Sequence, residues 1–278
     1  MQAVLPTKHS PIGVFDSGVG GLSVLRELRR QLPSEFLIYL ADQAHVPYGP
    51  RSLDEVKRFS IEITRYLLAK GAKLIVVACN TASAAALYTL RGMFPDTLFV
   101  GMEPAVKPAA EESRSGVVGV LATPATFQGK LYESVVERFA RNVVVLQDTC
   151  PGLVARIETG DLAGSETRKI LEKALNPMLV RGIDRIVLGC THYPFVIPLI
   201  EEIAGENVRV IDPAPAVARQ TARLLAGNGL ENGGKAAGET LFLTTGRAAA
   251  FREVLTRLLG TPGTVQQVHW QADGTLSG

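Results

Sequence analysis

The sequence predicts an α/β fold of two similar domains, each with a mainly parallel sheet flanked by helices. Short runs rich in Val, Ile and Leu alternate with longer segments of helical periodicity, a pattern typical of parallel sheets. Residues 70–81 (KGAKLIVVACNT) return in similar form as residues 181–192 (RGIDRIVLGCTH). Residues 12–17 (IGVFDS) likewise line up with residues 118–123 (VGVLAT). These repeats predict pseudo-symmetric domains with an active site in the cleft between them.

The expected elements follow in order along the chain. Apolar runs predict strands at residues 12–15, 36–41, 74–78, 98–101, 117–121, 143–146, 185–189, 208–211 and 241–244. Their unbroken hydrophobicity is typical of strands that are covered on both faces. Helical periodicity predicts helices at residues 22–31, 53–70, 81–91, 127–141, 167–180, 194–203, 214–226 and 247–259. The glycine-rich segment 226–239 is expected to be a loop.

The extent of the repeat predicts the domain boundaries. The second copy begins near residue 101 and is complete by about residue 211. We therefore expect residues 101–211 to form the second domain, and residues 1–100 with 212–278 to form the first. In this arrangement the C-terminal segment returns to complete the first domain.

Composition limits the classes of function. Of the 278 residues, 46% are hydrophobic and 20% are charged, which suits packed cores. The net charge of +2 and the lack of a basic block predict no nucleic-acid binding. No apolar run approaches the roughly 18 residues of a membrane span. The three cysteines have no disulfide-framework spacing, which indicates free thiols and a cytoplasmic location.

Polar residues stand where the expected strands end. They are Asp16, Ser17, Asp42, Cys79, Asn80, Thr81, Thr123, Cys190, Thr191 and His192. Ligands of open parallel sheets bind beyond the carboxyl ends of the strands. Two facing domains would therefore bring these side chains to one interdomain cleft, where small-molecule sites are common.

Cys79 and Cys190 occupy equivalent positions in the two copies, each directly before an expected helix. Free N–H groups and the helix dipole at such a position favour the thiolate, so we expect a thiol pKa below the usual value of about 8.5. A thiolate and a thiol on opposite sides of a carbon can remove a proton from one face and return one to the other. Asn80, Thr81 and Thr191 add donors that suit a carboxylate.

Several residues that could be functional also have plain structural interpretations. Cys150 is most simply a small buried apolar residue. Asp16 could cap a helix, and Asp42 could cap the turn after its strand. Glu158 could be a solvated charge near a helix end, and Tyr48 a loop aromatic packed on the surface.

Three other functions remain open on the residues alone. Gly18, Gly20 and Gly21 follow a strand as in dinucleotide-binding proteins, but Ser23 leaves the G-x-G-x-x-G pattern incomplete. A zinc or redox site could use both repeated cysteines and His192, although a fourth zinc ligand is missing. The same cleft could also bind a small anion without turnover.

Four motifs together are highly specific: residues 13–21 (GVFDSGVGG), 46–49 (VPYG), 79–83 (CNTAS) and 189–194 (GCTHYP). They resemble the aspartate/glutamate racemase family, and within it the glutamate racemases, over about residues 12–212. The resemblance implies interconversion of L- and D-glutamate without a cofactor or metal, which supplies D-glutamate for peptidoglycan. It also implies a homodimer. The preference for glutamate over aspartate comes from the resemblance alone.

The resemblance also implies residue roles. Cys79 and Cys190 match the two acid/base thiols, the first acting on D-glutamate and the second on L-glutamate. Asp16 matches the assistant of Cys79, while His192 and Glu158 match the assistants of Cys190. The matching substrate-binding positions are Asp16, Ser17, Tyr48, Gly49, Asn80, Thr81, Thr123, Thr191 and His192.

Overall fold

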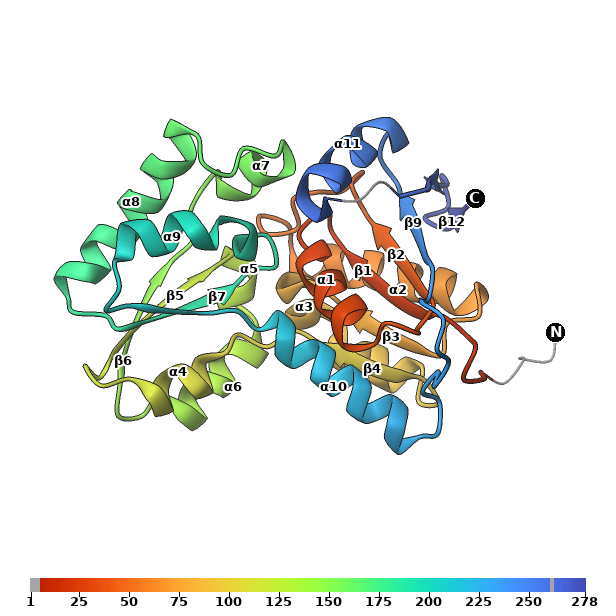
Figure 1. The fold of residues 1–278 in the computed structure, drawn as a ribbon, viewed down its shortest axis with the longest axis horizontal. Helices are drawn as coiled ribbons and strands as arrows, with labels where there is room; N and C mark the ends of the chain where they lie inside the picture. Colours follow the sequence, from red (N-terminus) through yellow and green to blue (C-terminus); the bar gives the residue numbers. More distant parts are fainter. Residues whose placement is uncertain (1–5, 261–262) are drawn as a thin grey trace.

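The computed structural model describes residues 6–260 and 263–278. Its strands form a six-stranded parallel sheet, a four-stranded parallel sheet and a small two-stranded hairpin. Helices flank both large sheets, and the two sheets lie side by side in the molecule (Figure 1). We call the part around the six-stranded sheet the first domain and the part around the four-stranded sheet the second domain. The predicted fold class is therefore confirmed.

The six-stranded sheet of the first domain has the order β10-β9-β2-β1-β3-β4. Its strands are β1 (Ile12–Asp16), β2 (Leu37–Ala41), β3 (Leu74–Val77), β4 (Leu98–Gly101), β9 (Thr240–Thr244) and β10 (Val265–Gln267). The accompanying helices are α1 (Leu22–Gln31), α2 (Leu53–Ala69), α3 (Asn80–Met93), α10 (Ala214–Gly227) and α11 (Ala248–Leu259). β1 lies between β2 and β3, so Asp16, at the end of β1, lies near the start of α3.

The sheet of the second domain has the order β6-β5-β7-β8. Its strands are β5 (Val117–Ala122), β6 (Val144–Asp148), β7 (Arg185–Gly189) and β8 (Arg209–Ile211). The helices are α4 (Val106–Glu112), α5 (Pro124–Phe127), α6 (Lys130–Phe139), α7 (Leu153–Glu158), α8 (Ser165–Val180) and α9 (Ile197–Ala204), with a 3₁₀ turn η1 (Tyr193–Val196) before α9. This order repeats β2-β1-β3-β4, and it places β5 and β7 where β1 and β3 lie. The sequence repeat thus corresponds to a pseudo-symmetric pair of sheets.

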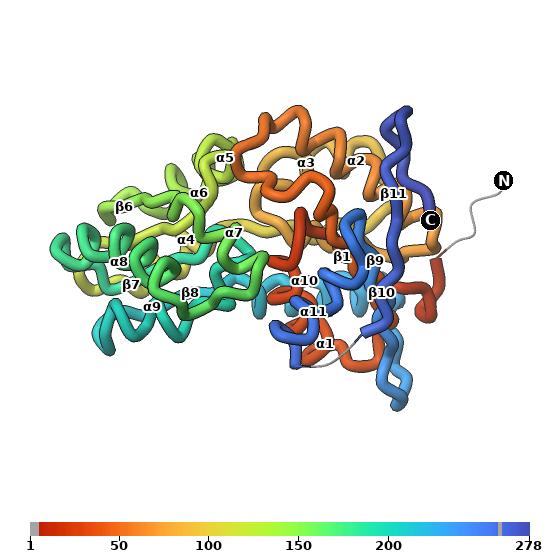
Figure 2. The backbone as a smooth tube through the Cα atoms, turned by 90° about the horizontal axis from the view of Figure 1, so that it is seen from above, coloured from red at the N-terminus to blue at the C-terminus, as the bar shows by residue number. Residues whose placement is uncertain are grey.

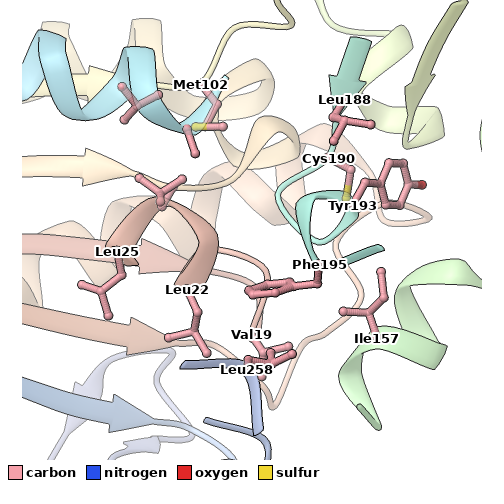
Figure 3. Packing of buried hydrophobic residues seen from close by; sticks show 14 of the residues in the cluster. Val19, Leu22, Leu25, Met102, Ile157, Leu188, Cys190, Tyr193, Phe195 and Leu258 are labelled. Atoms are coloured by element: carbon pink, nitrogen blue, oxygen red, sulfur yellow. The ribbon is translucent and has the colours of Figure 1, made fainter. Parts of the chain in front are cut away.

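One apolar cluster runs through both domains. Val19 and Leu22 of the first domain belong to the same cluster of buried side chains as Ile157 and Phe195 of the second. Figure 3 shows Phe195 and Ile157 close to Val19 and Leu258. Because burying a large apolar side chain stabilises by about 1.5–3 kcal/mol, this contact contributes to holding the domains together.

The helix expected at residues 127–141 is confirmed in part, as α6. It begins later than expected, because Gly129, in an extended conformation, separates α6 from the short helix α5. A side chain at Gly129 would press on Ala84 of α3, with an ideal Cβ only 2.6 Å from the Ala84 Cβ. Gly129 thus permits close contact between this segment and the first domain. The short helices α4 and α7 were not expected, because seven and six residues carry little periodicity.

The C-terminal segment joins the first domain. β9 pairs with β2 in parallel, and β10 pairs with β9. The chain then forms an antiparallel hairpin of β11 (His269–Trp270) and β12 (Leu276–Ser277) beside α2. Figure 2 shows this segment along the side of the first domain that is remote from the second. The glycine-rich segment after α10 has no helix or strand until β9, as predicted.

This strand order supports the division of the chain that we propose, with residues 101–211 as the second domain and the remainder as the first. Residues 1–5 and 261–262 of the proposed first domain lie outside the described residues. Among the helices of the described ranges, none combines the length and the apolar character that crossing a bilayer requires.

Candidate active site

A cavity of about 280 Å³ lies between the two domains, beyond the carboxyl ends of their central strands. The first domain contributes Ser17, Pro47, Tyr48, Gly49, Pro50, Cys79, Asn80 and Thr81 to its lining. The second domain contributes Thr123, Pro124, Thr149, Cys150, Pro151, Gly152, Val154, Ala155, Cys190, Thr191, His192 and Tyr193. Both repeated cysteines thus line one cavity from opposite domains.

Most of the residues singled out from the sequence line this cavity, but Asp16, Asp42 and Glu158 do not. Asp16 is fully buried, and its Oδ2 accepts a hydrogen bond of 2.7 Å from the Gly21 amide. The substrate contact expected for Asp16 stays a prediction, since its carboxyl group lies beside the Cys79 thiol and does not line the cavity. Its expected role as an assistant of that cysteine is compatible with this position.

Cys79 directly precedes α3 and acts as its N-cap. Its Sγ accepts a hydrogen bond of 3.5 Å from the Ala82 amide. Burial raises the pKa of the Cys79 thiol well above its ordinary value, and the neighbouring Asp16 carboxylate raises it further. The Ala82 amide acts in the opposite direction but is outweighed. The lowered pKa expected for Cys79 from its helix position was thus wrong, because desolvation and a nearby negative charge exceed the effect of the helix N-terminus.

Burial also raises the pKa of Asp16, although the positive charge of His192 and hydrogen bonds from Cys79 and the Gly21 amide oppose this shift. The first-domain half of the site therefore contains a buried thiol that resists losing its proton, beside a carboxyl group whose raised pKa makes its carboxylate a stronger base. A proton is accordingly available at Cys79 for donation into the cavity.

The second-domain half has the opposite electrostatic character. The Cys190 Sγ lies 3.7 Å from His192 Nδ1, and His192 Nε2 lies 2.6 Å from Glu158 Oε1. Burial alone would lower the pKa of His192, but hydrogen bonds with Cys190 and Glu158 raise it well above its ordinary value. Burial would raise the pKa of Glu158, but the bond and charge of His192 hold it below its ordinary value. Cys190 therefore lies next to an imidazolium that is paired with a carboxylate.

The glycine-rich loop between β1 and α1 receives these second-domain side chains. The Val19 amide donates a hydrogen bond of 2.8 Å to Glu158 Oε1. A Cβ at Gly18 would collide with the Glu158 carboxylate, and one at Gly20 would collide with the His192 ring. Ser23, which interrupts the dinucleotide-binding pattern, donates to the Thr191 carbonyl at 2.9 Å. The glycines thus permit a close approach of the two domains.

Asn80 presents polar atoms that lack partners within the protein. Its side chain is buried, and neither its amide oxygen nor its amide nitrogen is hydrogen-bonded to any described residue. An unsatisfied buried polar group costs about 1–3 kcal/mol. Because Asn80 lines the cavity at the start of α3, where free amides favour anions, the arrangement suits a ligand that carries a carboxylate.

Hydroxyl groups from both domains meet at the side of the cavity. The Thr81 Oγ1 lies 2.8 Å from the Thr123 Oγ1, which lies 2.9 Å from the Thr126 Oγ1. Tyr48 differs from these threonines, because its hydroxyl donates to Asp42 Oδ2 at 2.6 Å. Tyr48 therefore contributes a wall to the cavity but has its proton committed elsewhere.

Sequence reasoning missed one side of the cavity. Residues 149–152, 154 and 155 line it. Cys150 among them has a φ of 43° and belongs to no helix or strand. The only indication in the sequence was the Cys150-Pro151-Gly152 turn itself. In the described ranges, no three His, Cys, Asp or Glu side chains are grouped so that they could hold a metal ion.

His192 should make the stability of the protein depend on pH. Its pKa is raised well above the unfolded value of 6.5, so its stabilising contribution is complete below pH 6.5 and is lost as the pH rises through the folded-state pKa. Relative to His192→Gln, the wild-type free energy of unfolding should fall above pH 6.5 by up to about 1.4 kcal/mol per pH unit. Urea unfolding of both proteins at a series of pH values measures this difference. Parallel curves above pH 6.5 would contradict the assigned imidazolium.

Known proteins are similar to this chain in sequence and in fold. The Asp/Glu/Hydantoin racemase family matches residues 12–221. A glutamate racemase of Roseiflexus sp. (strain RS-1) is 52% identical over 249 residues, which cover 89% of this chain and 92% of that protein. A glutamate racemase of Pseudomonas aeruginosa (strain UCBPP-PA14) is 49% identical over 94% of this chain and 98% of its own.

Solved structures agree with the sequence matches. A glutamate racemase isoform of Bacillus anthracis superposes with a TM-score of 0.85 at 35% identity, covering 94% of this chain and 98% of its own. The Francisella tularensis subsp. tularensis SCHU S4 glutamate racemase in complex with D-glutamate gives 0.84 at 30% identity, covering 96% and 99%. This chain therefore belongs to the Asp/Glu/Hydantoin racemase family.

Proposed function

We propose that this protein interconverts L- and D-glutamate by a two-base mechanism in which Cys79 and Cys190 act from opposite sides of the substrate. The observation that carries the proposal is the placement of two thiols from equivalent strand ends in one interdomain cavity. The relatives named above are glutamate racemases, and one of their structures contains D-glutamate. Both support glutamate as the substrate.

In the proposed reaction on L-glutamate, the Cys190 thiolate takes the proton from the α-carbon. The electron pair of the broken C–H bond remains on the substrate as a carbanion, which its carboxylate delocalises. The Cys79 thiol then donates its proton to the opposite face, which gives D-glutamate, a Cys79 thiolate and a Cys190 thiol. D-Glutamate reacts by the same steps in reverse.

The two halves of the site suit these different starting roles. The raised pKa of Cys79 keeps its proton available for donation. His192 lies 3.7 Å from Cys190, so its Nδ1–H can donate to a thiolate there, while Glu158 holds the other ring nitrogen. For the reverse direction, Asp16 is positioned to accept the Cys79 proton, because it is hydrogen-bonded to that thiol. Each cysteine thus has an assistant of its own.

Stabilising the carbanion is the main chemical difficulty, because no pyridoxal-type electron sink is invoked. Preorganised donors in a closed site stabilise developing charge far better than water does. We assign this task to the Asn80 amide, the hydroxyl groups of Thr81 and Thr191, and the start of α3. The unsatisfied amide of Asn80 supports this assignment.

Three wider expectations accompany the proposed reaction. D-Glutamate produced here would serve peptidoglycan synthesis, and the free thiols suit a reducing cytoplasm. We also expect a homodimer, which sedimentation equilibrium of the purified protein can test. None of these expectations affects the chemistry in the cavity.

Circular dichroism of L-glutamate and L-aspartate solutions, incubated with purified protein and no added cofactor, tests the proposed function. We expect the signal of L-glutamate to decay to zero and that of L-aspartate to change far more slowly. The Cys79→Ala/Cys190→Ala double variant is the control for contaminating racemases. A stable L-glutamate signal with folded wild-type protein would contradict the proposal.

A further inference from the structure

A buried carboxylate next to the substrate cavity collects hydrogen bonds from three separate segments. Asp42 follows β2 and is fully buried. Its Oδ2 accepts from the Tyr48 hydroxyl at 2.6 Å and lies 2.9 Å from His45 Nδ1. Its Oδ1 accepts from the Thr245 hydroxyl at 2.8 Å and from the Trp270 indole N–H at 2.7 Å. Asp42 therefore links the loop after β2, the end of β9 and the C-terminal hairpin.

Aromatic packing fixes the direction from which Trp270 reaches this carboxylate. The His45 ring stacks on Phe59 of α2, with ring centroids 3.8 Å apart. Trp270 meets the His45 ring edge-on at 5.0 Å and the Phe59 ring at 5.7 Å. The hairpin that carries Trp270 also buries Leu276 in the core on this side of the sheet. The indole N–H is therefore aimed at Asp42 by packing against the His45 and Phe59 rings.

The donors around Asp42 matter because its burial is otherwise unfavourable. No Lys or Arg side chain among residues 6–260 and 263–278 pairs with Asp42, and His45 is the only side chain there that could form an ion pair with it. A buried carboxylate is tolerated only when hydrogen bonds replace its lost hydration. Removing one donor thus weakens the whole arrangement around the carboxylate, including the bond to Tyr48.

This arrangement reaches the cavity through Tyr48 and Gly49. Tyr48 is 1% exposed, and both residues line the cavity. The Gly49 carbonyl accepts a hydrogen bond of 3.3 Å from the Ala125 amide of the second domain. An ideal Cβ at Gly49 would lie 3.0 Å from the Thr123 Cβ. The loop is thus fixed on one side by Asp42 and contacts the second domain on the other.

We propose that Asp42 and Trp270 are positioning residues for glutamate binding, and that the C-terminal hairpin acts on the cavity through them. Trp270 orients the Asp42 carboxylate, which orients Tyr48 and so sets the position of Gly49 opposite Thr123. The proposal rests on the proposed function, because it concerns the same cavity. Neither residue lines the cavity, so the predicted effect is on substrate binding rather than on proton transfer.

Trp270→Phe tests this proposal, because it keeps an aromatic ring against Phe59 while it removes the N–H donor together with part of the indole ring. We expect the KM for L-glutamate to rise by about 3- to 10-fold while kcat changes by less than about twofold, as for a loss of uniform binding. Thr275→Ala is the matched control in the same hairpin. Its hydroxyl bonds only to Asp273 in the exposed turn, so the KM of this variant should equal that of the wild type.

A double-mutant cycle separates positioning from general destabilisation. If Trp270 acts through Asp42 on Tyr48, Trp270→Phe should raise the KM much less in a Tyr48→Phe background than in the wild type. Trp270 is the single tryptophan, so its fluorescence should also change in Tyr48→Phe, which gives a readout even if Trp270→Phe does not fold.

An unchanged KM in folded Trp270→Phe, equal effects in both backgrounds, or unaltered emission in Tyr48→Phe would overturn the proposal. An inactive wild type in the same assay would instead contradict the proposed function.

Discussion

Replacing either Cys79 or Cys190 with alanine is expected to lower racemisation of glutamate by about 10²- to 10⁴-fold, the usual contribution of a positioned acid or base. The reason is that each thiol serves as the base in one direction and as the acid in the other. Loss of either one therefore interrupts both directions. Circular dichroism at saturating L- and D-glutamate measures both rates.

Cys150→Ala is the matched control for these variants. Cys150 is the third free cysteine, it is buried, and it lines the same cavity. Its substitution by alanine should leave readily measurable racemisation, since we assign it no proton transfer. If Cys79→Ala or Cys190→Ala were as active as Cys150→Ala, two-base catalysis by this pair would be wrong.

The second large effect concerns the unequal assistants of the two thiols. Asp16→Asn should lower kcat mainly with D-glutamate, and His192→Gln should lower it mainly with L-glutamate, each on the order of 10²-fold. The reason is that Asp16 is hydrogen-bonded to Cys79, whereas His192 lies beside Cys190. Each variant should therefore slow proton removal by its own cysteine.

Thermodynamics limits how the rate constants of the two directions can differ. Enantiomers have equal free energies, so kcat/KM must be the same in both directions for every variant. The asymmetry will therefore appear in kcat, with a parallel change in KM, and in the isotope effects on α-deuterated substrates. Asp16→Asn should increase the isotope effect on D-glutamate, and His192→Gln that on L-glutamate. The same ratio of forward to reverse kcat in both variants would contradict the assignment.

Much of the fold could be predicted because its signals are local. Apolar runs and helical periodicity indicated β1 to β9 and the longer helices, and the repeat indicated the equivalence of β1 with β5 and of β3 with β7. The close approach of Gly129 to Ala84 of the other domain could not be predicted, because it depends on how the two domains pack. The register of β9 beside β2 likewise depends on packing between distant segments.

Within the candidate site, only the residues that stand at strand ends could be predicted from the sequence. Cys79, Cys190 and their polar neighbours follow from that rule and from the repeat. The contact of Glu158 with the Val19 amide does not, since α7 and the β1–α1 loop meet only after the domains pack. The pKa of Cys79 was predicted in the wrong direction, because its sequence neighbours indicate the helix but not the burial or the position of Asp16.

The position of solvent deuterium in early product tests two-base catalysis most directly. Wild-type protein is incubated with L-glutamate in deuterium oxide, and the α-positions of both enantiomers are analysed by NMR at low conversion. We predict deuterium in the D-glutamate formed and protium in the L-glutamate recovered, because one thiol removes the original proton and the other delivers a solvent-derived deuteron. Protium retained in the product, or equal deuterium in both enantiomers, would contradict the mechanism.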